Sequence, residues 1–175
     1  LILCPTRELA GQVAEELTGL GDPKGVRVLA VYGGAPMGPQ LKRLQAGCDI
    51  IVGTRGRVLD HIRRRTLRLE QAQMAVLDEA DEMLSMGFKK DLNLILDATT
   101  KSARNTWLFS ATMPTDLKAI VDRHISKDAV RVTIDKERIV NANITHHFIQ
   151  TTIANKANTL IALLEGREEE RGIIF

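Results

Sequence analysis

The stretch QMAVLDEADEML, at positions 73–84, places an apolar run directly before three carboxylates. Met74–Leu77 has the length and the uninterrupted apolar character of a β-strand that is covered on both faces. Asp78, Glu79 and Asp81 follow this run at once. The stretch therefore predicts a buried strand whose end presents side chains suited to hold a cation or to activate a water molecule.

Other short apolar runs alternate with amphipathic segments upstream and downstream of this stretch. Leu9, Val13 and Leu17 recur at helical spacing after Thr6, a residue type that caps helix N-termini. Strands and helices that alternate at this pitch predict an α/β fold with a parallel, doubly wound sheet. The expected strands are Leu1–Cys4, Arg27–Tyr32, Asp49–Val52, Met74–Leu77, Thr106–Phe109 and Val130–Thr133.

A second unit is expected after residues 135–143, a polar segment with little apolar pattern that we interpret as a linker. Strand-like ITHHFIQTT, helix-like NKANTLIALLEG and strand-like RGIIF follow within residues 144–175. One strand–helix–strand unit of this size cannot bury a core by itself. The second unit is therefore expected to be the beginning of a larger domain.

The composition is typical of a globular protein. The chain has 175 residues, of which 44% are hydrophobic and 26% charged, and its net charge is +2. No apolar run reaches the roughly 20 residues of a membrane span, so no membrane partner is expected. The first residues do not form a basic leader, so no signal peptide is expected. Cys4 and Cys48 are expected to be reduced thiols of a cytoplasmic protein.

The charge and aromatic content bear on nucleic-acid binding. Aromatic residues make up only 3% of the chain, which argues against platforms that stack bases. If the chain binds nucleic acid, it is therefore expected to grip the backbone. Six arginines fall within residues 55–68, a cluster that taken alone most often forms a solvated helix face.

Five of the expected strands end in small, polar or charged residues. The carboxyl ends of parallel strands lie along one edge, where open α/β sheets bind ligands. Asp78 is suited to hold Mg²⁺ through water molecules, and Glu79 is suited to orient or deprotonate an attacking water. Arginine forks, threonine hydroxyls and glycine N–H groups are suited to grip phosphates. The candidates for that grip are Arg7, Gly33, Gly34, Thr54, Gly56 and Arg57.

The order and spacing of these segments resemble the DEAD-box ATP-dependent RNA helicases of superfamily 2. The matching segments are PTRELA at 5–10, GG at 33–34, VLDEAD at 76–81, SAT at 110–112 and IIF at 173–175. The resemblance implies a RecA-like parallel sheet flanked by helices. It assigns residues 1–134 to a truncated ATP-binding first domain, 135–143 to a linker and 144–175 to the N-terminal part of a second RecA-like domain.

The resemblance also implies roles for individual residues. Asp78 would serve the Mg²⁺ of ATP, and Glu79 would be the catalytic base for the hydrolytic water. Asp81 would link to Ser110 and Thr112 and so couple ATP hydrolysis to strand separation. The implied activity is local unwinding of RNA duplexes or remodelling of RNA–protein complexes, with protein cofactors as further partners. The residues expected to touch the RNA backbone are Thr6, Arg7, Gly33, Gly34, Thr54, Gly56 and Arg57.

Position 55 departs from the family pattern Thr-Pro-Gly-Arg. Arg55 stands where the family has a proline, whose ring would fix the backbone φ angle. The arginine would either add a phosphate contact or remain a solvated charge. Between these two, we favour the solvated charge.

Two family motifs are absent from the sequence. None of the nine lysines follows a glycine, so there is no GxxxxGK[ST] phosphate loop, and the arginine-rich motif of the second domain is missing as well. By resemblance, the loop is expected upstream of residue 1. An arginine finger alone can contribute about 10³–10⁵ to the rate of phosphoryl transfer. The chain by itself is therefore expected to have no meaningful ATPase or unwinding activity.

Two other functions are compatible with these motifs. The first is an RNA-binding or regulatory module that never hydrolyses ATP, and the second is a translocase of the same superfamily that acts on DNA. His146 and His147 have no partner at zinc-ligand spacing and are expected to be structural. The expected location is the cytoplasm, or the nucleus if the protein is eukaryotic.

Overall fold

The computed structural model describes residues 1–100, 104–134, 144–145, 147–166 and 171–174. The chain divides into two units, Leu1–Val130 and Arg131–Phe175. The predicted linker at 135–143 and the predicted structural residue His146 lie outside the described residues. The assignment of the second unit to a second RecA-like domain stays a prediction.

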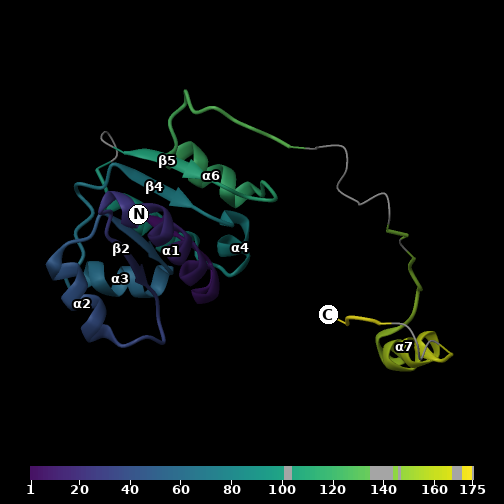
Figure 1. Cartoon of the computed structure of the whole chain (residues 1–175). Coiled ribbons are helices and arrows are strands. Elements are labelled where there is room, and N and C mark those ends of the chain that lie inside the picture. The colour runs from purple at the N-terminus through teal and green to yellow at the C-terminus, as the bar shows by residue number, and fades with distance from the viewer. Residues whose placement is uncertain (101–103, 135–143, 146, 167–170, 175) are drawn as a thin grey trace. The chain divides into compact units, whose positions relative to one another are not determined.

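The first unit is built on a five-stranded parallel sheet (Figure 1). The strands lie in the order β2-β3-β1-β4-β5, and every pairing between neighbours is parallel. The predicted α/β fold with a parallel sheet is therefore confirmed. The strands are β1 (Ile2–Leu3), β2 (Val28–Val31), β3 (Ile50–Gly53), β4 (Met74–Leu77) and β5 (Asn105–Leu108).

Helices connect consecutive strands, as parallel pairing requires. The first begins after Thr6, whose hydroxyl accepts a hydrogen bond from the N–H of Leu9 at 3.2 Å, so the predicted N-cap is confirmed. The helices of this unit are α1 (Arg7–Gly21), the 3₁₀ turn η1 (Asp22–Lys24), α2 (Met37–Ala46), α3 (Arg55–Arg63), α4 (Ala80–Ser85), α5 (Lys89–Asp97) and α6 (Thr115–His124).

Strand side chains alternate between two cores, one on each face of the sheet. Cys4, Val28 and Val52 pack with Ala10 and Ala14 of α1 on one face. The larger core on the other face joins strand residues to the helices α3, α4, α5 and α6. Its members include Leu3, Leu29, Val31, Ile51, Val58, Leu77, Met83, Leu92, Ile95, Leu117 and Ile120. Coverage of both faces explains why the strand sequences are continuously apolar.

The only regular structure in the described part of the second unit is helical, and the three strands predicted from Val130 onward are wrong. The predicted helix is present as the 3₁₀ turn η3 (Ile153–Asn155) followed by α7 (Lys156–Leu164). The described residues of Val130–Thr133, 144–152 and 171–175 carry no strand. A strand needs a neighbour for its backbone hydrogen bonds, and the described residues offer none there: Val130 and Phe148 are 90% and 91% exposed. Within the described ranges, no helix has both the length and the apolar character needed to cross a membrane.

Candidate active site

Two carboxylates lie at the end of β4. The backbone N–H of Asp78 donates to the carbonyl of Leu3 at 2.9 Å, so the ladder between β4 and β1 extends to this residue. Oδ1 of Asp78 accepts a hydrogen bond from the N–H of Glu79 at 3.1 Å. Glu79 has a φ of 49°, in the left-handed region that side chains other than glycine seldom adopt. Such strained positions persist where the surroundings hold them, and they cluster at functional sites.

Asp81, in the first turn of α4, is tied to the loop that follows β5. Its Oδ2 accepts two hydrogen bonds from Thr112, from the backbone N–H at 2.8 Å and from the hydroxyl at 2.8 Å. The N–H of Asp81 donates to Oγ of Ser110 at 3.3 Å, and that hydroxyl donates to the carbonyl of Thr112 at 2.7 Å. The structure therefore brings together the three residues that were predicted to be linked.

The charge of Asp81 is stabilised by these bonds. Burial by itself would raise the pKa of the carboxyl group, but the hydrogen bonds from Thr112, together with the nearby hydroxyl of Ser110, outweigh it and lower the pKa below its ordinary value. Asp81 is therefore ionised in the folded chain at neutral pH. A charged acceptor makes stronger hydrogen bonds, which suits a residue that joins two loops.

Cys4 lies at the end of β1, beside the end of β4. Its thiol is buried, and its N–H donates to the carbonyl of Gly53 in β3 at 3.0 Å. Burial, together with the nearby charges of Asp78 and Glu79, raises the pKa of the thiol to about 12. Cys4 and Cys48 are both free, so the predicted thiols carry no bridge. The neutral thiol of Cys4 contributes packing beneath the carboxylates.

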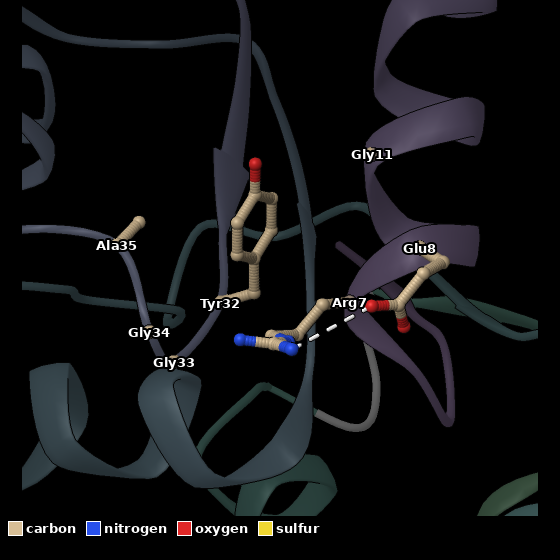
Figure 2. A pocket seen from close by; sticks show the side chains of 7 residues that line it. All are labelled: Arg7, Glu8, Gly11, Tyr32, Gly33, Gly34 and Ala35. Carbon is tan, nitrogen blue, oxygen red and sulfur yellow. Dashed lines mark ion pairs between the residues drawn. The ribbon is translucent and has the colours of Figure 1, made fainter.

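Several of the residues predicted to grip phosphates line a hollow between α1 and the end of β2 (Figure 2). The hollow is open to solvent and has a volume of about 340 Å³. In Figure 2 the Arg7 side chain extends from the start of α1 toward the loop of Gly33 and Gly34. Its one ion pair in the figure, with Glu8 at 3.7 Å, is exposed and weak. The lining residues are Arg7, Glu8, Gly11, Tyr32, Gly33, Gly34 and Ala35.

Gly34 requires glycine because of its backbone conformation, and a side chain there would also displace Arg7. Its φ is +82°, and a Cβ atom built there would overlap Nη1 of Arg7. The neighbouring Gly33 differs, because a Cβ atom there meets nothing within 4 Å. Of these two glycines, only Gly34 is therefore needed by the fold, and it leaves room for the guanidinium group of Arg7.

The loop after β3 lies close to the loop after β2. The N–H of Thr54 donates to the carbonyl of Val31 at 3.0 Å, and Nη1 of Arg57 donates to the carbonyl of Ala35 at 3.0 Å. A Cβ atom on Gly56 would meet nothing within 4 Å. Arg57 thus holds the glycine loop in place, a role that the sequence did not indicate. The predicted grip residues of the two loops form one neighbourhood.

A buried hydrogen-bond network next to these two loops was not predicted from the sequence. Gln40 in α2 donates from Nε2 to the carbonyl of Tyr32 at 3.1 Å, which turns its Oε1 to Nε2 of His61 at 3.2 Å. Nδ1 of His61 lies 2.8 Å from the hydroxyl of Thr66. His61 is fully buried, and burial followed by the charge of Arg57 lowers its pKa. In a neutral ring with its proton on Nε2, Nε2 donates to Oε1 of Gln40 and Nδ1 accepts from the hydroxyl of Thr66, which also lies 3.1 Å from the carbonyl of His61.

Arg55 is not a solvated charge, so that interpretation is wrong. Its Nη1 forms an ion pair with Oδ2 of Asp91, and the guanidinium carbon lies 3.6 Å from the centroid of the Phe88 ring. The side chains of Arg55 and Asp91 are 35% and 24% exposed. Helix α3 packs against α5, which brings an acid from another element within reach. No local sequence signal reports that contact.

A magnesium ion fits the carboxylates only in a particular way. Among the described residues, no three His, Cys, Asp or Glu side chains cluster closely enough to hold a metal ion. Asp78 uses one oxygen for the N–H of Glu79, and within the described part of the chain its other oxygen accepts no hydrogen bond. Mg²⁺ keeps several of its waters and takes few protein ligands. The donor set therefore suits a hydrated ion that is held mainly by phosphate oxygens.

The family is decided by comparison with known proteins. Residues 1–120 match the family model described as DEAD/DEAH box helicase. The chain belongs to this family. This DEAD/DEAH box helicase chain is 43% identical over 175 residues to the DEAD-box ATP-dependent RNA helicase CshA of Bacillus licheniformis and 42% identical to that of Bacillus subtilis. It is covered completely in both comparisons but spans only 36% and 35% of the two relatives, about a third of their length.

Solved structures agree with this membership. A DEAD box protein from Methanococcus jannaschii is 41% identical, with a TM-score of 0.70 over 95% of this chain and 44% of that one. A hypothetical ATP-dependent RNA helicase from Sulfolobus tokodaii is 37% identical, with a TM-score of 0.68 over 72% of this chain and 38% of that one. The helicase chain therefore shares the fold of these proteins, and the predicted RecA-like fold class is confirmed.

Proposed function

We propose that the chain is the part of an ATP-dependent RNA helicase in which nucleotide chemistry and RNA contact share one edge of a sheet. The single observation that supports this most is the link from Asp81 to Thr112 and Ser110, beside the carboxylates of β4. The parallel order of the strands puts the ends of β2 and β3 on the same edge. Two chemistries on one rigid edge can be coupled mechanically.

At the proposed nucleotide site, Asp78 would hold water molecules of a Mg²⁺ ion bound to ATP phosphates. The ion would neutralise charge that develops on the transferred phosphoryl group. Glu79 is exposed at the start of α4, where its carboxylate would orient the attacking water and accept its proton. The left-handed backbone of Glu79 would direct its carboxylate away from the ion pairs and helix caps in which acidic side chains usually take part.

At the proposed RNA site, Arg7 and Arg57 would face the ribose-phosphate backbone. Thr6 and Thr54 would be the hydroxyl donors. Gly56 is exposed at the first turn of α3, where a phosphate could approach free N–H groups. Contacts of this kind carry no base information, so recognition would be independent of sequence. RNA, and not DNA, would be the substrate, as the names of the relatives suggest.

Coupling would pass through the loop that Asp81 holds. Movement at the γ-phosphate would shift the start of α4, and the bonds to Thr112 and Ser110 would transmit the shift to the loop after β5. The whole protein would use this to separate RNA strands locally. Protein cofactors and a cytoplasmic location remain predictions.

The chain by itself is proposed to bind RNA without hydrolysing ATP. Its sequence contains no GxxxxGK[ST] segment, so no lysine is available here for the β- and γ-phosphates. The non-hydrolysing RNA-binding module that the sequence also allows would thus describe this chain, and the enzyme would be the longer protein.

The test is RNA-stimulated ATP turnover by the protein encoded by the whole reading frame. Glu79→Gln keeps the size of the side chain and removes the base, so turnover is expected to fall by about 10²–10⁴-fold. Glu82→Gln, on an exposed acid of the same helix, is the matched control and should keep full turnover. Full turnover in Glu79→Gln would remove Glu79 from the proposed role. Equal stimulation by DNA of the same length would favour the DNA translocase.

A further inference from the structure

Arg55 lies at the first position of α3, directly between two residues of the proposed RNA loop, Thr54 and Gly56. Its guanidinium group does not extend along that loop. It pairs with Asp91 in the first turn of α5 and stacks on Phe88, the residue that precedes α5. Arg55 therefore connects the loop after β3 to the start of α5.

The start of α5 is itself joined to α4, the helix that carries Asp81. The N–H of Phe88 donates to the carbonyl of Met83 in α4 at 3.1 Å, and the N–H of Leu92 donates to the carbonyl of Phe88 at 3.0 Å. Phe88 is thus fixed from both sides by backbone hydrogen bonds. A side chain that grips Phe88 and Asp91 is attached to the junction between α4 and α5.

Arg55 is poorly placed to contact RNA directly. Its Nη1 is used by Asp91, and its Nε is buried without a hydrogen-bond partner among the described residues. One guanidinium nitrogen is therefore paired with Asp91 and a second is buried, so two of the three face the protein. The pair is only partly exposed, so salt screens it less than an ordinary surface pair. Proline, the residue that the family pattern has here, offers no such attachment.

We propose that Arg55 is a positioning residue that couples the RNA loop at the start of α3 to the junction between α4 and α5. The coupling sets the affinity for RNA without a contact between Arg55 and the RNA. This inference rests on the proposed RNA contacts of Gly56 and Arg57. The contacts of Arg55 would be a second connection between the proposed RNA site and α4, separate from the contact between Asp81 and Thr112.

The first test needs no RNA. Hydrogen exchange is measured on the 175-residue chain at the amides of Val58 and Leu92, which bond to Thr54 and Phe88 across the two helix starts. Arg55→Ala is expected to speed exchange at both amides, because one attachment serves both. The control is Arg64→Ala, which breaks an exposed pair with Asp60 at the C-terminal end of α3 and should change exchange at neither amide. Unchanged exchange at both amides in Arg55→Ala overturns the proposal.

The second test separates positioning from direct contact. Binding of a ten-nucleotide oligouridylate is followed by fluorescence anisotropy at several salt concentrations. Arg55→Ala and Asp91→Ala are each expected to weaken binding about tenfold, which corresponds to about 1.4 kcal/mol. The slope of log affinity against log salt should stay the same. Loss of a phosphate contact would instead reduce its magnitude by about 0.7.

The decisive variant exchanges the two charges. Arg55→Asp alone is expected to bind RNA more weakly than Arg55→Ala, because two carboxylates then face each other. Arg55→Asp combined with Asp91→Arg is expected to recover affinity to within about twofold of the original chain, less than 0.5 kcal/mol. Failure to recover, together with a reduced salt slope, makes Arg55 a phosphate contact and overturns the proposal. If the original chain binds no RNA, the proposed function is contradicted. The hydrogen-exchange experiment, which needs no RNA, still decides whether Arg55 links the two helix starts.

Discussion

Asp81 and Thr112, which are 31 positions apart in the sequence, are joined by two hydrogen bonds of 2.8 Å to the same carboxylate oxygen. One comes from the backbone and holds the loop, and the other comes from the hydroxyl and can be removed by substitution. The start of α4 and the loop after β5 therefore move as one piece as long as both bonds persist. The predictions below begin with this contact.

Thr112→Val removes the hydroxyl bond and keeps the shape of the side chain. The free energy of unfolding is expected to fall by about 1 kcal/mol, because a bond to an ionised acceptor is lost. Urea unfolding of the chain measures this. Thr115→Val, at the exposed first position of α6, is the control and should stay within about 0.5 kcal/mol. In the whole protein, Thr112→Val should lower strand separation more than ATP turnover, and an equal loss of both would contradict the proposed coupling.

The stability that Asp81 contributes should depend on pH in a defined direction. Its pKa in the folded chain lies below 3.8, so the unfolded chain binds the proton more tightly. The contribution is therefore fully present well above the ordinary pKa of an aspartate and is lost as pH falls through the lower pKa of the folded chain. Urea unfolding of the original chain and of Asp81→Asn should differ by about 1 kcal/mol at pH 7 and by less below pH 3.8. A difference that grows on acidification would be contrary to this linkage.

Gly34→Ala should disturb both the fold and Arg7. The left-handed backbone costs an alanine about 1–2 kcal/mol, and the new methyl group would overlap the guanidinium group. We expect the free energy of unfolding to drop by that amount and the affinity for oligouridylate to fall. Gly33→Ala is the matched control for stability, because the space around Gly33 is open. Equal destabilisation by the two substitutions would show that the loop can relax around Gly34.

Gly56→Ala should separate stability from RNA binding. Its backbone is helical and the space around it is open, so alanine is expected to add about 0.5–1 kcal/mol to the free energy of unfolding. The same methyl group would keep a phosphate away from the first turn of α3, so the affinity for RNA should fall. Gly19→Ala, near the C-terminal end of α1, should bring the same kind of stabilisation with unchanged RNA binding. Undiminished binding by Gly56→Ala would exclude a close backbone approach there.

Glu79→Gly should stabilise the chain although it removes the proposed base. The φ of 49° is unfavourable for any L side chain, and glycine relieves a cost of about 1 kcal/mol. Glu79→Gln keeps that cost and should leave the free energy of unfolding within about 0.5 kcal/mol. Both variants should lose ATP turnover in the whole protein. Destabilisation by Glu79→Gly would mean that the carboxylate itself supports the fold.

Much of the first unit was predictable from local patterns. Met74–Leu77 is a strand with the predicted bounds, and Thr6 caps α1 as its side chain suggested. The predicted strand at Val130–Thr133 is wrong because its apolar residues satisfy a pattern but find no neighbour among the described residues. Strand propensity describes a fit to a half-buried sheet, so it fails where no sheet is supplied.

The sequence by itself determined which chemistry each strand end carries, because a strand's covered faces and the residues after it are local properties. Only the tertiary structure decided how those ends serve one another. In the folded chain, Arg57 contacts the carbonyl of Ala35 and His61 contacts the amide of Gln40. Arg55 pairs with the carboxylate of Asp91. Each pair joins different elements, and the packing of helices against the sheet sets their separation. No periodicity within one segment can encode such a distance.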